Sequence, residues 1–78
     1  MPKHYNYYKL IGNFDGQQDV LFGAYLRSEC VYEKRAEREQ LLDAGYLKLT
    51  IITEKTTTAP DPEVYTSRQL AVIEMDAK

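Results

Sequence analysis

Cysteine and histidine are nearly missing from this chain of 78 residues, which has one of each. Because Cys30 has no second cysteine to pair with, the chain can form no internal disulfide and no cysteine-rich zinc site. His4 lies outside every predicted element, so Ser28 and Cys30, the candidate nucleophiles, have no evident general base. The sequence therefore predicts a protein that is not an enzyme and that holds no metal and no cofactor.

An excess of one charge is also missing, since ten Lys and Arg residues stand against twelve Asp and Glu residues. This near-neutral balance argues against a strongly basic nucleic-acid binder and against an acidic imitator of DNA. No apolar run approaches the roughly 20 residues of a membrane span, and residues 1–16 lack the apolar core of a signal peptide. We therefore expect a cytoplasmic protein that is not attached to a membrane and whose thiol stays reduced.

The short chain leaves little room for a hydrophobic core, because a domain of this size buries only roughly 60% of its unfolded surface. Such domains are often stabilised by disulfides, by a metal or by a partner chain. With disulfides and cysteine-rich zinc sites excluded, two alternatives stay open. The chain folds alone, or it is completed by a partner or a second copy of itself.

The first part of the chain has the pattern of a hairpin. Residues 5–12 are rich in tyrosine and aliphatic side chains, which suit a pleated surface. Asp15-Gly16 is typical of a tight turn, and residues 19–25 read as the return strand. Gly23 within that strand indicates a bulge or the close approach of another backbone. One face of the strand is predicted to carry Val20, Phe22 and Ala24.

A helix is predicted over residues 29–44. Ser28 is a suitable N-cap, because its hydroxyl can accept a hydrogen bond from the first turn. Gly45 is a suitable residue just beyond the C-terminal end, where a left-handed conformation is common. These two signals fix the expected length of the helix.

Residues 46–54 alternate apolar and polar side chains, as a half-buried strand does. Threonines and prolines make residues 55–62 a loop. The last segment, 63–78, is predicted to be a short helix, because Thr66 and Gln69 have the spacing of a capping box. A strand in this segment remains an alternative. The sequence thus predicts one ββαβ domain over residues 1–54, with the loop and the last segment belonging to it.

The order of these elements predicts an α+β fold, a two-layer sandwich of one sheet and one long helix. A right-handed crossover makes the second and third strands parallel. If the third strand lies beside the first, the sheet is antiparallel throughout and has the order 2-1-3. Such a sheet can leave its other face open to solvent or to a partner.

The long helix is badly patterned for burying one face. Its apolar side chains are expected to face the sheet within an arc of about 120°, and they are Cys30, Val31, Leu41 and Leu42. Lys34 and Arg38 occupy the middle of that arc. We therefore expect the helix to be anchored at its two ends, with charged side chains between them.

The charges of this helix are segregated, which suggests a docking surface. Glu29, Glu33 and Glu37 are four residues apart and form one acidic stripe, with Tyr32 and Ala36 beside it. Tyrosine is a favoured anchor at interfaces, and aligned carboxylates attract a positive partner. These five residues are the predicted binding surface for another protein with a basic surface.

Two alternatives use other residues. A nucleic-acid-associated regulator would bind through helix cations and tyrosines of the first strand, which are Lys34, Arg35, Arg38, Tyr5 and Tyr7. A structural or assembly protein would form a homodimer or larger homo-oligomer through a tyrosine-rich sheet face or a strand edge. The sequence does not decide between these roles and the first.

The stretch LFGAYLRSECVYEKRAERE (21–39), followed by Gly45-Tyr46, resembles small accessory proteins of enterobacterial phages and prophages. The resemblance lies in length and tyrosine content rather than in a motif. It implies a compact non-enzymatic protein, located in the host cytoplasm, that binds a host complex and inhibits or modulates it, as inhibitors of the anti-CRISPR kind do.

Overall fold

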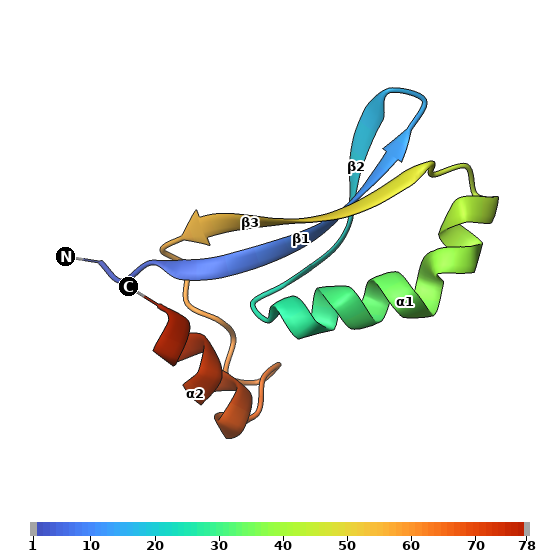
Figure 1. The fold of residues 1–78 in the computed structure, drawn as a ribbon. Coiled ribbons are helices and arrows are strands. Elements are labelled where there is room, and N and C mark those ends of the chain that lie inside the picture. The colour runs from blue at the N-terminus through green and yellow to red at the C-terminus, as the bar shows by residue number, and fades with distance from the viewer. Residues whose placement is uncertain (1, 78) are drawn as a thin grey trace.

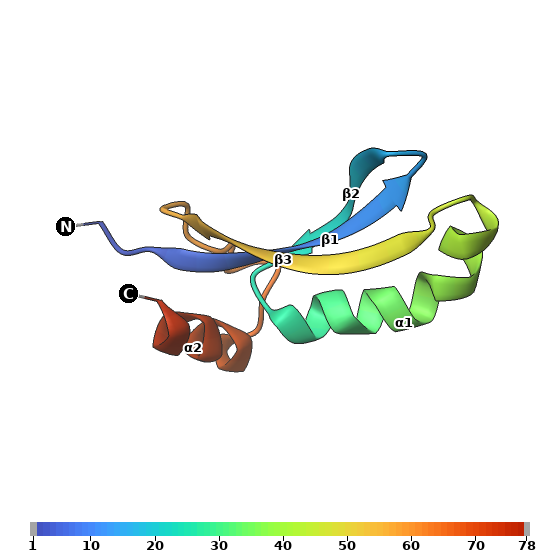
Figure 2. The same ribbon diagram turned by 45° about the horizontal axis from the view of Figure 1, so that its top comes forward.

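Three strands form one antiparallel sheet in the order β2-β1-β3, and two helices lie on the same side of it (Figure 1 and Figure 2). This structure, a computed structural model, describes residues 2–77. The elements in chain order are β1 (Tyr5–Phe14), β2 (Gln17–Ala24), α1 (Arg27–Asp43), β3 (Lys48–Thr56) and α2 (Ser67–Asp76). The predicted α+β class, the antiparallel sheet order and the short C-terminal helix are confirmed.

The hairpin of β1 and β2 turns at Asp15 and Gly16, which have φ angles of 49° and 81°. Positive φ at both central residues is the requirement of the tight hairpin turn that an Asp-Gly pair satisfies. The turn therefore forms where the sequence predicted it, and both strands extend to it.

A register shift interrupts the pairing of β1 with β2, because Leu10 pairs with Phe22 while the next residue, Ile11, pairs with Val20. Leu21 is the extra residue of this bulge. Since Leu10 and Ile11 point to opposite faces, their partners do so too. The predicted common face for Val20 and Phe22 is therefore wrong, and Val20 is 60% exposed.

Gly23 is not the site of the bulge, although the sequence singled it out. A Cβ atom there would lie 2.2 Å from the hydroxyl oxygen of Tyr7, so the Tyr7 side chain covers this glycine. The close approach predicted at Gly23 exists, but a side chain makes it rather than another backbone.

Helix α1 begins earlier than predicted. Its N-cap is Leu26, without a side-chain cap, and the Glu29 N–H donates to the Leu26 carbonyl at 3.1 Å. The prediction of Ser28 as the cap is wrong. The chain turns into the helix directly after Tyr25, whose backbone N–H donates to the Tyr65 hydroxyl oxygen, so a tertiary contact holds the residue just before the N-cap.

The other end of α1 follows the local prediction. Gly45 has a φ of 107°, and its N–H donates to the Leu42 carbonyl at 3.1 Å. The Tyr46 N–H donates to the Leu41 carbonyl, also at 3.1 Å. This pair of hydrogen bonds is the Schellman arrangement, which satisfies helix carbonyls with a left-handed residue beyond the end.

The core lies between the sheet and the first turns of α1, where Leu10 and Cys30 are both 0% exposed. The Cys30 thiol donates to the Tyr8 carbonyl at 3.4 Å. Leu42 is 44% exposed, so the expected apolar anchor at the C-terminal end of α1 is weaker than predicted. The buried apolar residues of the described chain are Tyr5, Leu10, Ile11, Ala24, Cys30 and Ile73.

Helix α2 begins at the predicted capping box. The Gln69 N–H donates to the Thr66 hydroxyl at 3.1 Å, and the Thr66 N–H donates to the Gln69 side chain at 2.9 Å. The helix is docked through Ile73, which is 3% exposed. Glu74 forms an ion pair with Lys3. The last segment is thus a helix over Ser67–Asp76, and the strand alternative is wrong.

Candidate functional site

Tyr25 stands at the centre of a tyrosine cluster at one end of the sheet. Its ring lies edge-on to those of Tyr7 at 5.0 Å, Tyr65 at 6.0 Å and Tyr5 at 6.4 Å between centroids. Its hydroxyl donates to the Thr58 carbonyl at 2.8 Å. These tyrosines join the sheet to the loop before α2, so their abundance is explained by packing.

Tyr46 packs at the end of the molecule opposite the tyrosine cluster. Its ring lies edge-on to Phe14 at 5.8 Å, and its hydroxyl donates to the Asp19 carboxylate at 3.0 Å. Tyr8 is half-buried. Of the seven tyrosines, all within the described residues, Tyr32 alone is exposed, at 73%. Tyr32 is therefore the tyrosine that the fold does not use.

Tyr32 borders a shallow groove of about 330 Å³ between α1 and β2. We call it the acidic groove; it is lined by Phe22, Ser28, Glu29, Tyr32 and Glu33. Two aromatic side chains and two carboxylates thus surround one depression. Carboxylates bind basic side chains through charge-assisted hydrogen bonds, and aromatic faces attract the same cations.

The structure brings together Glu29, Tyr32 and Glu33 of the five predicted contact residues. Ala36 is exposed and Glu37 is half-buried, but neither lines the groove. The three glutamates of the predicted stripe are half-buried along the flank of α1. They lie on the flank because Cys30 is the residue of α1 that is buried against the sheet. The acidic stripe therefore lies next to β2.

Phe22 was missed as a groove residue. It was predicted to share a strand face with Val20, but the bulge at Leu21 separates the two residues. The sequence signal that could have identified Phe22 is that it is a large apolar residue in a strand predicted to pack beside a helix. Ser28, expected to cap the helix, lies instead at the rim of the acidic groove.

The other flank of α1 carries the opposite charge. A groove of about 370 Å³ lies between α1 and β3. We call it the basic groove; it is lined by Arg27, Val31, Lys34, Arg35, Arg38 and Ile51. The helix cations of the nucleic-acid alternative are therefore together, but the tyrosines of that set are not with them. Tyr5 is buried in the tyrosine cluster, and Tyr7 lies on the face of the sheet away from α1.

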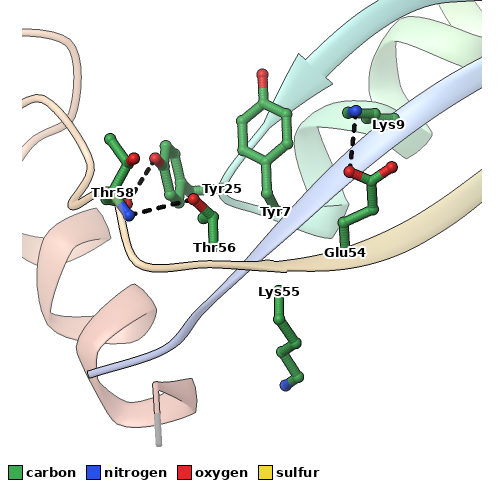
Figure 3. Close-up of a pocket in the computed structure, with 7 residues that line it drawn as sticks. All are labelled: Tyr7, Lys9, Tyr25, Glu54, Lys55, Thr56 and Thr58. Carbon is green, nitrogen blue, oxygen red and sulfur yellow. Dashed lines mark hydrogen bonds and ion pairs between the residues drawn. The ribbon is translucent and has the colours of Figure 1, made fainter. Parts of the chain in front are cut away.

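A hollow of about 490 Å³ lies on that other face beside Tyr7 and Tyr25 (Figure 3). Lys9 and Glu54 point into it and form an ion pair at 2.9 Å, while Lys55 points to the opposite side of the strand. The two charged side chains that point into the hollow thus neutralise one another. This arrangement stabilises the sheet and presents no nucleophile paired with a base.

Cys30 is the one thiol, and its surroundings make it inert. Burial raises its pKa, and the nearby Glu29 carboxylate adds to this effect. The thiol is therefore protonated at neutral pH and is not a thiolate nucleophile. Among residues 2–77, no group of three or more His, Cys, Asp and Glu side chains is placed to hold a metal ion. No helix in the same range is long and apolar enough to cross a membrane.

A scan against models of known protein families found no match. Searches of curated proteins and of solved structures found no similar chain either. The grooves described above are therefore the features of this protein that bear on its function.

Proposed function

We propose that this protein is a non-enzymatic protein-binding module that docks a basic segment of its partner in the acidic groove. The observation that carries the proposal is Tyr32, which is 73% exposed beside Phe22, Glu29 and Glu33. A large side chain left out of a small core, next to grouped carboxylates, is the composition expected of an interface anchor. It is not the composition of a face that serves solubility alone.

The chemistry of the groove favours an arginine or lysine side chain as the docked group. A guanidinium lying against the Tyr32 ring would gain cation–π attraction, and Glu29 and Glu33 would accept its hydrogen bonds. Glu29 and Glu33 are one helical turn apart, so their carboxylates suit cations about 6 Å apart. The acidic stripe, continued by Glu37, would also speed the approach of a positive partner.

The proposed biological role is to inhibit or modulate a host protein complex, in line with the resemblance to phage accessory proteins. In such a role the module needs affinity and no chemistry of its own. The inert thiol and the mutually neutralised Lys9–Glu54 pair support a binding role over a catalytic one.

Selection from a random peptide library on the immobilised protein tests the proposal. We expect the recovered peptides to be enriched in arginine and lysine and to lose their binding to the Tyr32→Ala variant. Arg68→Ala, an exposed change on α2, is the control and should leave binding unchanged. Recovered peptides that bind the Tyr32→Ala variant as well as the wild type would contradict the proposal.

A further inference from the structure

The basic groove concentrates cations that the fold does not neutralise. Among residues 2–77 the salt bridges are Lys3–Glu74 and Lys9–Glu54, and neither involves α1. Arg27, Lys34, Arg35 and Arg38 are thus four cations around one groove without an ion-pair partner in the described part of the chain. Helix neighbours of like charge destabilise a helix, so this grouping indicates an anionic partner.

The groove is bordered by the free edge of β3. In the order β2-β1-β3, one side of β3 pairs with β1, and no strand within residues 2–77 pairs with the other side. Pairing with β1 runs from Lys48 to Thr56 without a register shift, and the strand contains no proline. An edge that is long, regular and unblocked can take up another strand by backbone hydrogen bonding.

The two features lie on the same side of the molecule. Ile51 belongs to β3 and lines the basic groove together with Val31 of α1. A strand added along β3 would place every second side chain on the face that carries Ile51. Those side chains would lie beneath Arg35 and its neighbouring cations, whereas the alternate ones would face away from α1.

We propose that β3 and the basic groove together bind an extended acidic peptide segment, about nine residues long, with carboxylates at alternate positions. The backbone of the segment pairs with the outer edge of β3, and its carboxylates meet the cations of α1. This surface is separate from the acidic groove and takes a partner segment of opposite charge. It therefore goes beyond the function proposed above.

A second copy of this chain is a poorer occupant. Pairing two β3 edges would bring the unpaired cations of two α1 helices next to each other, and like charges repel. A nucleic-acid strand is also a poorer fit, because Val31 and Ile51 line the groove and no stacking aromatic does. An acidic strand satisfies the free backbone edge and the cations at once.

The test uses the full chain, labelled with nitrogen-15, and a nine-residue peptide in which Glu alternates with Thr. Titration followed by NMR should shift the amide signals of β3 and slow hydrogen exchange of its outward N–H groups. Two N-methylated forms of the peptide, each with one alternate set of N–H groups blocked, should differ sharply in their affinity for the protein. The form blocked on the side that faces β3 should lose binding, and the other form should keep it.

Matched charge reversals distinguish binding at this surface from a general effect of the protein's net charge. Arg35→Glu should weaken peptide binding by about tenfold, because an attractive contact becomes repulsive. Arg68→Glu makes the same charge change on α2 and should weaken it by less than about twofold. Glu33→Arg, which disrupts the acidic groove, should not weaken it, so the two proposals fail independently.

Several outcomes would overturn the proposal. They are no binding at millimolar peptide, equal binding of both N-methylated forms, and equal effects of Arg35→Glu and Arg68→Glu. Tighter binding of a nine-nucleotide single strand than of the peptide, at the same salt concentration, would assign the cations to nucleic acid. Self-association of the free protein through β3, detected by sedimentation, would assign the edge to a second copy.

Discussion

The hydroxyl oxygen of Tyr65 accepts a hydrogen bond from the backbone N–H of Tyr25 at 3.0 Å, across 40 residues of sequence. Tyr25 follows the last residue of β2 and precedes α1, so its N–H has no strand or helix partner. The phenol therefore satisfies a backbone donor that would otherwise be left unpaired at the junction of two elements.

Replacing Tyr65 with Phe should lower the free energy of unfolding by about 1–2 kcal/mol, because the part-buried N–H of Tyr25 loses its acceptor while the ring contact remains. Urea denaturation followed by circular dichroism measures the change. Tyr32→Phe removes an exposed hydroxyl and should change stability by less than about 0.5 kcal/mol. Equal effects of the two changes would mean that the Tyr25–Tyr65 bond has no structural role.

The Lys3–Glu74 contact predicts a loss of stability in acid. Hydrogen bonding and attraction from Lys3 lower the pKa of Glu74 below its usual value, assisted by the Tyr5 hydroxyl, which donates at 3.2 Å. A lowered folded-state pKa stabilises the fold above the unfolded pKa of about 4.5. That contribution is lost as the pH falls through the folded-state value.

Glu74→Gln should therefore be less stable than the wild type near pH 7, with the difference shrinking as the pH falls below about 4.5. Denaturation midpoints measured from pH 2 to pH 7 report this difference. Glu63→Gln, in the loop before α2, forms no ion pair within residues 2–77 and should show no such trend. A difference that is constant across the range would show that Glu74 acts without its charge.

Alanine variants of Gly45 and Gly16 distinguish two causes of lost stability, backbone strain and steric crowding. Both glycines have positive φ, at 107° and 81°. A Cβ at Gly45 would lie 2.3 Å from the Phe14 ring, whereas a Cβ at Gly16 would meet nothing within 4 Å. Gly16→Ala should cost about 1 kcal/mol of stability from strain, and Gly45→Ala about 1–3 kcal/mol more from overpacking. Thermal unfolding of both variants measures the difference, and equal losses would contradict the contact with Phe14.

Cys30 provides a probe of opening at the core. Its side chain is fully buried and burial raises its pKa, so a thiol reagent should react only when the protein opens. Modification of the native protein should be slower than that of the urea-unfolded protein by a factor of about 10² or more. Leu10→Ala, which removes the other fully buried large side chain, should speed this modification. Rapid modification of the native wild type would contradict the burial of this residue.

Local chemistry allowed much of the fold to be predicted. The Asp15-Gly16 turn, the Schellman end at Gly45 and the capping box of Thr66 each depend on a few adjacent residues. Alternation of apolar residues gave the strands, and their connections gave the order β2-β1-β3. The turn, the Schellman end and the capping box form where the sequence predicted them because their hydrogen bonds join residues close together in the chain. The third strand was predicted over residues 46–54 but spans Lys48–Thr56, so Lys55 and Thr56, predicted to lie in the loop, belong to the strand.

The wrong predictions concern features set by distant residues. The N-cap of α1, Leu26, follows Tyr25, whose N–H donates to the distant Tyr65. The bulge at Leu21 has no sequence signal in its own strand. Two of the alternatives assigned the tyrosines of β1 to nucleic-acid contact or to a homodimer face. Tyr5 and Tyr7 instead pack on Tyr25. The acidic groove was therefore only partly predicted, because Phe22 enters it through the bulge.

Binding of a basic helical peptide, with two arginines four residues apart, tests the central proposal most directly. Isothermal titration calorimetry should be carried out on the wild type, Glu33→Arg and Glu39→Arg. The two variants make the same charge change on α1, and both positions are within the helix, but Glu33 lines the acidic groove and Glu39 does not. We predict that Glu33→Arg abolishes binding while Glu39→Arg weakens it by less than about threefold. Equal losses in the two variants would show that the peptide responds to net charge, and the acidic groove would not be the docking site.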